Sequence, residues 1–328
     1  MSTQIVNLNS AFAPRTDADK IALIEEIHEL ARSRKAIILA HNYQMPDVQD
    51  IADFVGDSLG LSLEAQKTDA ETIIFCGVHF MAESAKVLNP EKRVLLPNLS
   101  AGCSLADSIT PESLEDWKRR YPDHSVVTYV NSTADVKAMS DICCTSANAV
   151  SIVRSLPNHK ILFTPDRNLG NWVKKQVPEK EVVIYDGVCP IHDVLRGANV
   201  EKTRSAFPDS VVIAHPECRE DILAIADEIC STTAMLGRIA KYPNVKTFIV
   251  ATENGIIHQM KKRYPDKEFV VADGCIGCRL NCPYMKMITP FDIRRSLLEN
   301  KFEIEVDEDV MVGARLALER MLAVPRDN

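Results

Sequence analysis

Residues 36–44 read AIILAHNYQ, a run of five apolar residues followed by mainly polar ones. A short apolar run of this kind is typical of a strand buried on both faces of a parallel sheet. Polar residues directly after such a strand lie at the carboxyl edge of the sheet, where open α/β sheets bind their ligands. The stretch therefore predicts an α/β fold with functional side chains at strand ends.

The same pattern occurs twice more along the chain. Apolar runs at 126–128 and 211–214 lead into Tyr129-Val130-Asn131 and His215-Pro216-Glu217. Segments of α/β structure resemble one another in general, but here polar groups recur in step with the apolar runs. Hydroxyl side chains follow 14–15 residues after each polar group, at Ser58, at Ser146, and at Ser231 with Thr232.

This repetition predicts three αβα domains, each with a parallel sheet, related by a pseudo-three-fold axis. We expect an N-terminal arm at 1–16 and repeats at 17–119, 120–206 and 207–328. The last repeat includes a C-terminal stretch whose apolar pattern predicts helices that close over the third domain. In this arrangement the strand ends of all three domains converge on a central active site.

Cysteines also follow the repeat, since Cys103 and Cys189 are 86 residues apart. The third repeat offers Cys275, Cys278 and Cys282, spaced as C-x2-C-x3-C-Pro, and such thiolates suit iron–sulfur clusters or zinc. A strict 86-residue period selects Cys275, whereas the Cys-Pro pair shared with Cys189 selects Cys282, which we favour. Instead of binding a cluster, these three cysteines could form a redox-active CxxC dithiol or an incomplete zinc knuckle.

Composition narrows the classes of function. The 328-residue chain has a net charge of −8, which argues against a general nucleic-acid binder. Its N-terminus lacks a signal-peptide pattern, and no apolar run is long enough for a membrane span. We therefore expect a cytoplasmic protein without membrane or nucleic-acid partners, in which ten cysteines indicate metal binding or catalysis rather than disulfides.

Taken together, these motifs resemble those of the quinolinate synthases, the A proteins of bacterial NAD biosynthesis. The matching stretches are spread in order over most of the chain. They are 41–44 (HNYQ), 56–58 (GDS), 101–104 (AGCS), 129–131 (YVN), 144–149 (CTSANA), 187–192 (GVCPIH), 215–218 (HPEC), 252–255 (TENG) and 282–285 (CPYM).

The resemblance implies a [4Fe-4S] cluster bound by Cys103, Cys189 and Cys282, with one iron open to substrate as a Lewis acid. It also implies a transferase that condenses iminoaspartate with dihydroxyacetone phosphate to give quinolinate, phosphate and two waters. L-aspartate oxidase or aspartate dehydrogenase would supply the iminoaspartate. Some members have C-x2-C-x2-C in the last cysteine group, whereas this chain has one more residue before Cys282.

Tyr43 and Glu217 are the best acid–base candidates, together with His41, because the reaction needs several proton transfers. The hydroxyls expected at helix starts suit phosphate or carboxylate binding, although plain helix capping is the ordinary role of such residues. The predicted substrate-binding residues are His41, Ser58, Tyr129, Asn131, Ser146, His215, Glu217, Ser231 and Thr232.

Two other classes of protein remain open from the residues alone. One is a redox or cluster-sensing protein, which would not need the polar groups at the strand ends. The other is a zinc-dependent aldolase or hydrolase with a thiolate-rich site. Cys275 and Cys278 could form a regulatory disulfide or be an exposed pair without a role.

Overall fold

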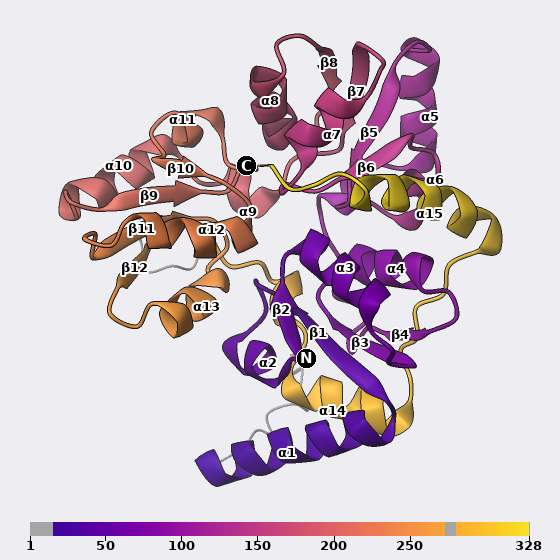
Figure 1. Ribbon diagram of the computed structural model, residues 1–328, viewed down its shortest axis with the longest axis vertical. Helices are drawn as coiled ribbons and strands as arrows, with labels where there is room; N and C mark the ends of the chain where they lie inside the picture. The colour runs from indigo at the N-terminus through magenta and orange to yellow at the C-terminus, as the bar shows by residue number, and fades with distance from the viewer. Residues whose placement is uncertain (1–15, 273–279, 328) are drawn as a thin grey trace, which may run out of the picture.

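The computed structural model describes residues 16–272 and 280–327, and within them the chain forms three four-stranded parallel sheets. The strand orders are β2-β1-β3-β4, β6-β5-β7-β8 and β10-β9-β11-β12, so each sheet repeats the same topology. Figure 1 shows the three sheets and their helices grouped around the middle of the molecule. The predicted fold class, three αβα units built on parallel sheets, is confirmed.

The first unit is built on a sheet whose strand β3 is buried along its whole length and whose strand β1 is buried from Ile38 onward, in keeping with their apolar runs. Its strands are β1 (Ala36–His41), β2 (Phe54–Gly56), β3 (Thr72–Cys76) and β4 (Arg93–Leu95). Its helices are α1 (Asp17–Ser33), α2 (Pro46–Ile51), α3 (Ser58–Lys67) and α4 (His79–Leu88), followed by the 3-10 turn Ala106–Ser108.

The second unit repeats this plan. Its strands are β5 (Ser125–Tyr129), β6 (Ile142–Cys144), β7 (Lys160–Thr164) and β8 (Glu181–Ile184). Its helices are α5 (Pro111–Arg120), α6 (Ala134–Ala138), α7 (Ala149–Ser155), α8 (Arg167–Gln176) and the short α9 (Pro190–Asp193). Leu114 of α5 packs with Val126 and Leu162 of the sheet.

The third unit begins with α10 (Gly197–Ala206), whose Val200 packs with Val212 of its sheet. Its strands are β9 (Val211–Ala214), β10 (Glu228–Ile229), β11 (Thr247–Ala251) and β12 (Glu268–Val271). Its helical segments are α11 (Glu220–Leu223), α12 (Thr232–Arg238), α13 (Ile256–Arg263) and the 3-10 turns Ile239–Lys241 and Tyr284–Lys286. The domain limits that the sequence predicts, at 17–119, 120–206 and 207–328, stay predictions.

One hydrogen bond between an aspartate and the backbone is present at the same position in all three units. Asp53, Asp141 and Asp227 each precede the second strand of their sheet, and each accepts a backbone N–H from the first strand. The N–H groups belong to Ile38, Val126 and Val212, at 2.8, 2.7 and 2.8 Å. α/β segments in general do not share such a bond, so its recurrence indicates that the three units are structural repeats.

The two C-terminal helices lie elsewhere than expected. Helix α14 (Pro290–Glu299) packs against α1, and α15 (Glu308–Leu322) packs against α4, α6 and β6. They therefore cover the first and second units, not the third (Figure 1). The contact of α15 with α6 needs Gly313, because a Cβ there would lie 2.7 Å from the carbonyl oxygen of Ala138. Within the described residues, no helix is long and apolar enough to cross a membrane.

Candidate active site

One cavity is lined by residues from all three units. Most of the predicted site residues lie around it: His41, Tyr43, Ser58, Cys103, Tyr129, Asn131, Ser146, Cys189, His215, Glu217, Thr232 and Cys282. Ser231 is the exception. Its hydroxyl donates to Asp57 Oδ2 at 3.4 Å, while Asp57 itself and the neighbouring Thr232 line the cavity.

The three cysteines occupy equivalent backbone positions. In each unit the carbonyl two residues before the cysteine accepts an N–H from the segment after the third strand of the unit. These bonds are His79 N to Ala101 O at 2.7 Å, Arg167 N to Gly187 O at 2.7 Å, and Asn254 N to Leu280 O at 2.9 Å. Cys282 is thus the backbone counterpart of Cys103 and Cys189, while Cys275 and Cys278 lie outside the described residues.

Burial raises the pKa of all three thiols, that of Cys103 to about 12. Backbone N–H groups of the turn after each cysteine oppose this rise, because they stabilise a thiolate. The negative charge of a Cys282 thiolate also raises the pKa of Cys103, and that of a Cys103 thiolate raises the pKa of Cys189. Three half-buried thiols that resist ionisation on their own are suited to a cationic metal centre, which stabilises the thiolate form.

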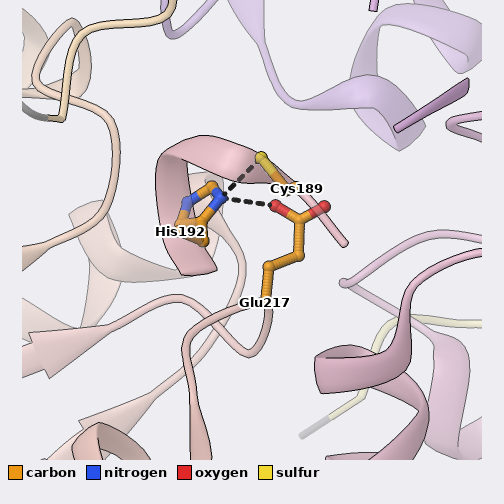
Figure 2. A group of neighbouring side chains, drawn as sticks. All are labelled: Cys189, His192 and Glu217. Carbon is orange, nitrogen blue, oxygen red and sulfur yellow. Dashed lines mark hydrogen bonds and ion pairs between the residues drawn. The ribbon is translucent and has the colours of Figure 1, made fainter. Parts of the chain in front are cut away.

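Glu217 lies between two histidines at the end of β9. Its Oε2 is 2.9 Å from Nδ1 of His192 and 3.2 Å from Nδ1 of His215 (Figure 2 shows the first contact). Burial by itself raises the pKa of Glu217, but His192 and His215 outweigh it and hold the pKa well below its ordinary value. The second oxygen, Oε1, is buried and has no partner among the described residues, so it is available to a ligand.

A chain of hydrogen bonds joins Tyr43 to Glu217. The Tyr43 hydroxyl lies 2.5 Å from Thr252 Oγ1, which lies 2.8 Å from Nε2 of His192. His192 Nδ1 then contacts Glu217 and also lies 3.2 Å from Cys189 Sγ. Burial raises the pKa of Tyr43 well above its ordinary value, so the hydroxyl keeps its proton in the free protein. The two acid–base candidates thus belong to one buried network.

His41 is neutral at neutral pH, because burial lowers its pKa to about 4. Its Nδ1 accepts the N–H of Tyr43 at 3.2 Å, which leaves the ring proton on Nε2. Asn131 adds a further polar group, and its Oδ1 has no hydrogen-bond partner within the described part of the chain. The cavity wall therefore carries both donors and acceptors that are free for a ligand.

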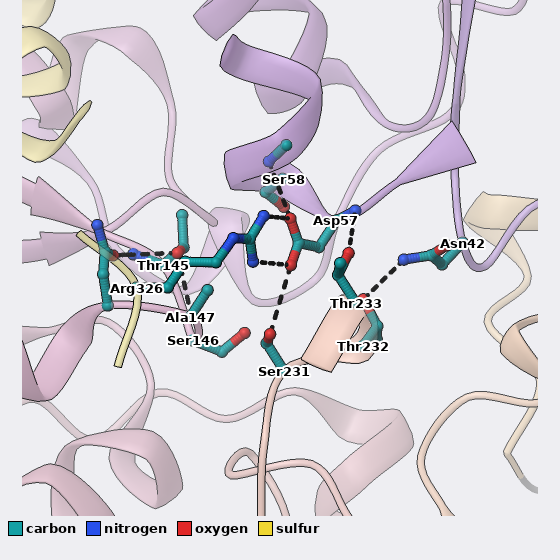
Figure 3. Close-up of polar contacts among 12 residues, drawn as sticks. Asn42, Asp57, Ser58, Thr145, Ser146, Ala147, Ser231, Thr232, Thr233 and Arg326 are labelled. Atoms are coloured by element: carbon teal, nitrogen blue, oxygen red, sulfur yellow. Dashed lines mark hydrogen bonds and ion pairs between the residues drawn. The ribbon is translucent and has the colours of Figure 1, made fainter. Parts of the chain in front are cut away.

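The helix starts of the first and third units meet at a single aspartate, Asp57 (Figure 3). Asp57 caps α3 by accepting the N–H of Gly60 at 2.8 Å, and its own N–H donates to Thr233 Oγ1 at 3.2 Å. Arg326, from the C-terminal tail, binds both carboxylate oxygens at 2.6 and 2.8 Å. Burial raises the pKa of Asp57, but the arginine outweighs it and lowers the pKa overall.

The same tail reaches the second unit. Asp327 donates its N–H to Ala147 O at 2.6 Å, and its carboxylate accepts the N–H groups of Val150 and Ser151 at 3.2 and 2.8 Å. Together with the ion pair to Asp57, this fixes the start of α7 beside the start of α3. The tail residues thus help to place Ser146 near Ser58.

Several residues of this site were not among those predicted from the sequence. They include Asp57, Thr145, Thr252, Glu253, Met285 and Arg326. Glu253 and Thr252 do lie in one of the matching stretches, but a carboxylate in a polar tetrapeptide gives no sign that it will be buried. Arg326 could not be found by the repeat, because it lies outside all three units.

Known proteins match this chain over most of its length. A family model described as quinolinate synthetase A protein matches residues 25–323. The chain is 48% identical over 301 residues to the quinolinate synthase of Thermodesulfovibrio yellowstonii, an alignment that covers 92% of this chain and 98% of the relative.

Two further relatives give the same result. The chain is 51% identical over 302 residues to the quinolinate synthase of Geotalea uraniireducens, with 92% of this chain and 97% of the relative covered. It is 50% identical over 302 residues to that of Microcystis aeruginosa, with 92% and 94% covered. By sequence over nearly its full length, and in agreement with its fold, the chain belongs to the quinolinate synthase family.

Proposed function

We propose that the chain is a quinolinate synthase of NAD biosynthesis, which condenses iminoaspartate with dihydroxyacetone phosphate to give quinolinate, phosphate and two waters. The observation that carries the proposal is the common cavity of Cys103, Cys189 and Cys282, one cysteine from each unit. Polar groups from the strand ends line the same cavity, so a metal centre there would face a substrate.

The residues present fit a [4Fe-4S] cluster with three protein ligands. Among the residues that the structure describes, only Cys189, His192 and Glu217 bring three potential ligand atoms within 4.8 Å of one another. The three cysteines are therefore spread more widely than the ligands of a single ion. That spread suits a cluster of several iron atoms better than one tetrahedral zinc.

A cluster with one iron not bound by cysteine supplies a Lewis acid, which can polarise a hydroxyl or carboxylate oxygen of the substrate. Such assistance suits a reaction that expels water, because hydroxide is a poor leaving group. Everything else in the proposal depends on the chain's own side chains.

Glu217 is the proposed general base. Its low pKa keeps it ionised, and Oε1 is free to accept a proton from a substrate carbon or hydroxyl. Tyr43 is the proposed general acid, since its hydroxyl is protonated and is joined to Glu217 through Thr252 and His192. Protons taken up at one end of this network can be returned at the other without entry of bulk water.

The remaining cavity residues are proposed to bind the substrates. Neutral His41 and Asn131 offer hydrogen bonds to carboxylate or carbonyl oxygens. Ser58 opens the ten-residue helix α3, whose N-terminal N–H groups favour an anion such as the phosphate of dihydroxyacetone phosphate. The proposed binding set also keeps Tyr129, Ser146, His215, Ser231 and Thr232, with Ser231 acting through Asp57.

Quinolinate formation tests the proposal directly. The protein is purified without oxygen and supplied with dihydroxyacetone phosphate and iminoaspartate generated in the same vessel by L-aspartate oxidase or aspartate dehydrogenase. We expect quinolinate and phosphate in equal amounts, and loss of the activity after exposure to air.

Two results would contradict it. A protein with full iron and sulfide content but no product would favour the redox or sensing class. A protein that holds zinc and no inorganic sulfide would favour the zinc-dependent aldolase or hydrolase.

A further inference from the structure

Two buried carboxylates occupy the same position in the second and third units. Asp166 lies two residues after β7, and Glu253 lies two residues after β11. Both are almost wholly inaccessible, with exposed fractions of 0% and 1%. A carboxylate that is buried needs several hydrogen bonds to be stable, so the partners of each one indicate its role.

Each carboxylate accepts the backbone N–H of the cysteine in its own unit. Asp166 Oδ2 lies 3.1 Å from Cys189 N, and Glu253 Oε1 lies 3.1 Å from Cys282 N. The cysteines are the two that stand before proline. The same side-chain-to-amide contact at the same distance, in two units of unrelated local sequence, indicates a shared purpose.

The opposite oxygen of each carboxylate is anchored as well. Asp166 Oδ1 accepts the N–H of Leu169 at 2.7 Å, and Glu253 Oε2 accepts the N–H of Gly255 at 2.7 Å. Glu253 also pairs with Lys286 Nζ at 2.9 Å, four residues after Cys282. Each cysteine is therefore tied through a rigid carboxylate to the end of a central strand.

The first unit has the same backbone geometry but no carboxylate. The residue two places after β3 is Val78, whose side chain cannot accept a hydrogen bond. The adjacent His79 still donates its N–H to Ala101 O, as the equivalent residues do in the other units. The carboxylate is thus an addition to the common fold in two units, not a requirement of the fold.

We propose that Asp166 and Glu253 are positioning residues for the cluster, which hold Cys189 and Cys282 by their amide groups in the orientation that binds iron. This role rests on the proposed function, because it needs the cluster. Groups that orient metal ligands change metal affinity by about 10- to 100-fold when they are removed. An amide held by a carboxylate is also kept from donating to a cluster sulfur, a bond that influences the reduction potential.

The test uses the full chain with Asp166→Asn and Glu253→Gln, each in a separate protein. Both oxygens of each carboxylate accept an N–H, so an amide must turn its NH2 group toward one of these donors. Asp141→Asn is the matched control, because Asp141 accepts the N–H of Val126 at 2.7 Å and does not line the cavity. Urea unfolding of the cluster-free proteins checks that the variants fold.

Iron and sulfide content and the rate of cluster loss to a chelator are the readouts, with no need of enzyme activity. We expect cluster loss about 10- to 100-fold faster than in the unchanged protein for Asp166→Asn and Glu253→Gln. The control is expected to match the unchanged protein. The midpoint potential of the remaining cluster should rise in both variants, a change that a merely structural role would not produce.

Equal rates in all four proteins would overturn the role, and so would equally fast loss in the Asp141→Asn control. If one variant fails to fold, the other decides, because the two residues lie in different units. Absence of iron and sulfide from the unchanged protein would instead contradict the proposed function, and with it this inference. The two failures are therefore distinguishable.

Discussion

Cys282→Ser is expected to fold but to hold no [4Fe-4S] cluster and to make no quinolinate. A serine hydroxyl is a hard, weakly acidic ligand, whereas iron–sulfur clusters require soft thiolates. The change removes one of the three proposed ligands, and among the described residues no other cysteine lines the cavity. Iron and inorganic sulfide analysis after anaerobic reconstitution measures the loss.

Cys218→Ser is the matched control. Cys218 is fully buried, does not line the cavity, and donates from its thiol to Ala251 O at 3.2 Å, a bond that a serine hydroxyl can replace. We expect it to keep its cluster, as we expect of Cys275→Ser, although Cys275 lies outside the described residues. If Cys282→Ser kept its full iron and sulfide content, Cys282 would not be the third ligand, and Cys275 or Cys278 would take that role.

Arg326→Ala is expected to lower the free energy of unfolding by about 2–3 kcal/mol. Asp57 is 7% exposed at its side chain, and the substitution leaves it ionised and buried without its cation. Removal of one partner of a fully buried ion pair costs more, but Arg326 is 35% exposed, so water reduces the loss. Urea unfolding of the cluster-free protein measures the change.

Two companion proteins make the result specific. Arg320→Ala removes an exposed arginine of α15 that donates to Asp141 O, and we expect it to change stability little. Adding Asp57→Asn to Arg326→Ala removes the unpaired charge and should restore part of the loss. If Arg326→Ala unfolds at the same urea concentration as Arg320→Ala, the buried ion pair does not stabilise the fold.

The strand ends and most of the site could be predicted because they depend on local patterns. An apolar run such as residues 36–40 is largely buried when it lies in a parallel sheet, and the polar residues after it must then lie at the sheet edge. Repetition of that pattern was enough to group His41, Tyr129 and His215, which are far apart in the sequence.

Contacts outside the repeat could not be predicted in this way. The pairing of Asp57 with Arg326 spans 269 residues, and no periodicity links the two. The packing of α15 on α6 depends on a backbone contact at Gly313, which one glycine in a helical pattern does not reveal. Nor does a strand-end motif show that Ser231 faces Asp57 while Thr232 faces the cavity.

Mössbauer spectroscopy of protein reconstituted with 57Fe, recorded with and without quinolinate, tests the central claim most directly. The claim is that three cysteines hold the cluster and leave one iron open to the substrate. The account predicts that quinolinate changes the spectrum of one iron site and leaves the cysteine-bound sites unchanged. A spectrum that quinolinate does not alter, from protein with a full cluster, would contradict the account.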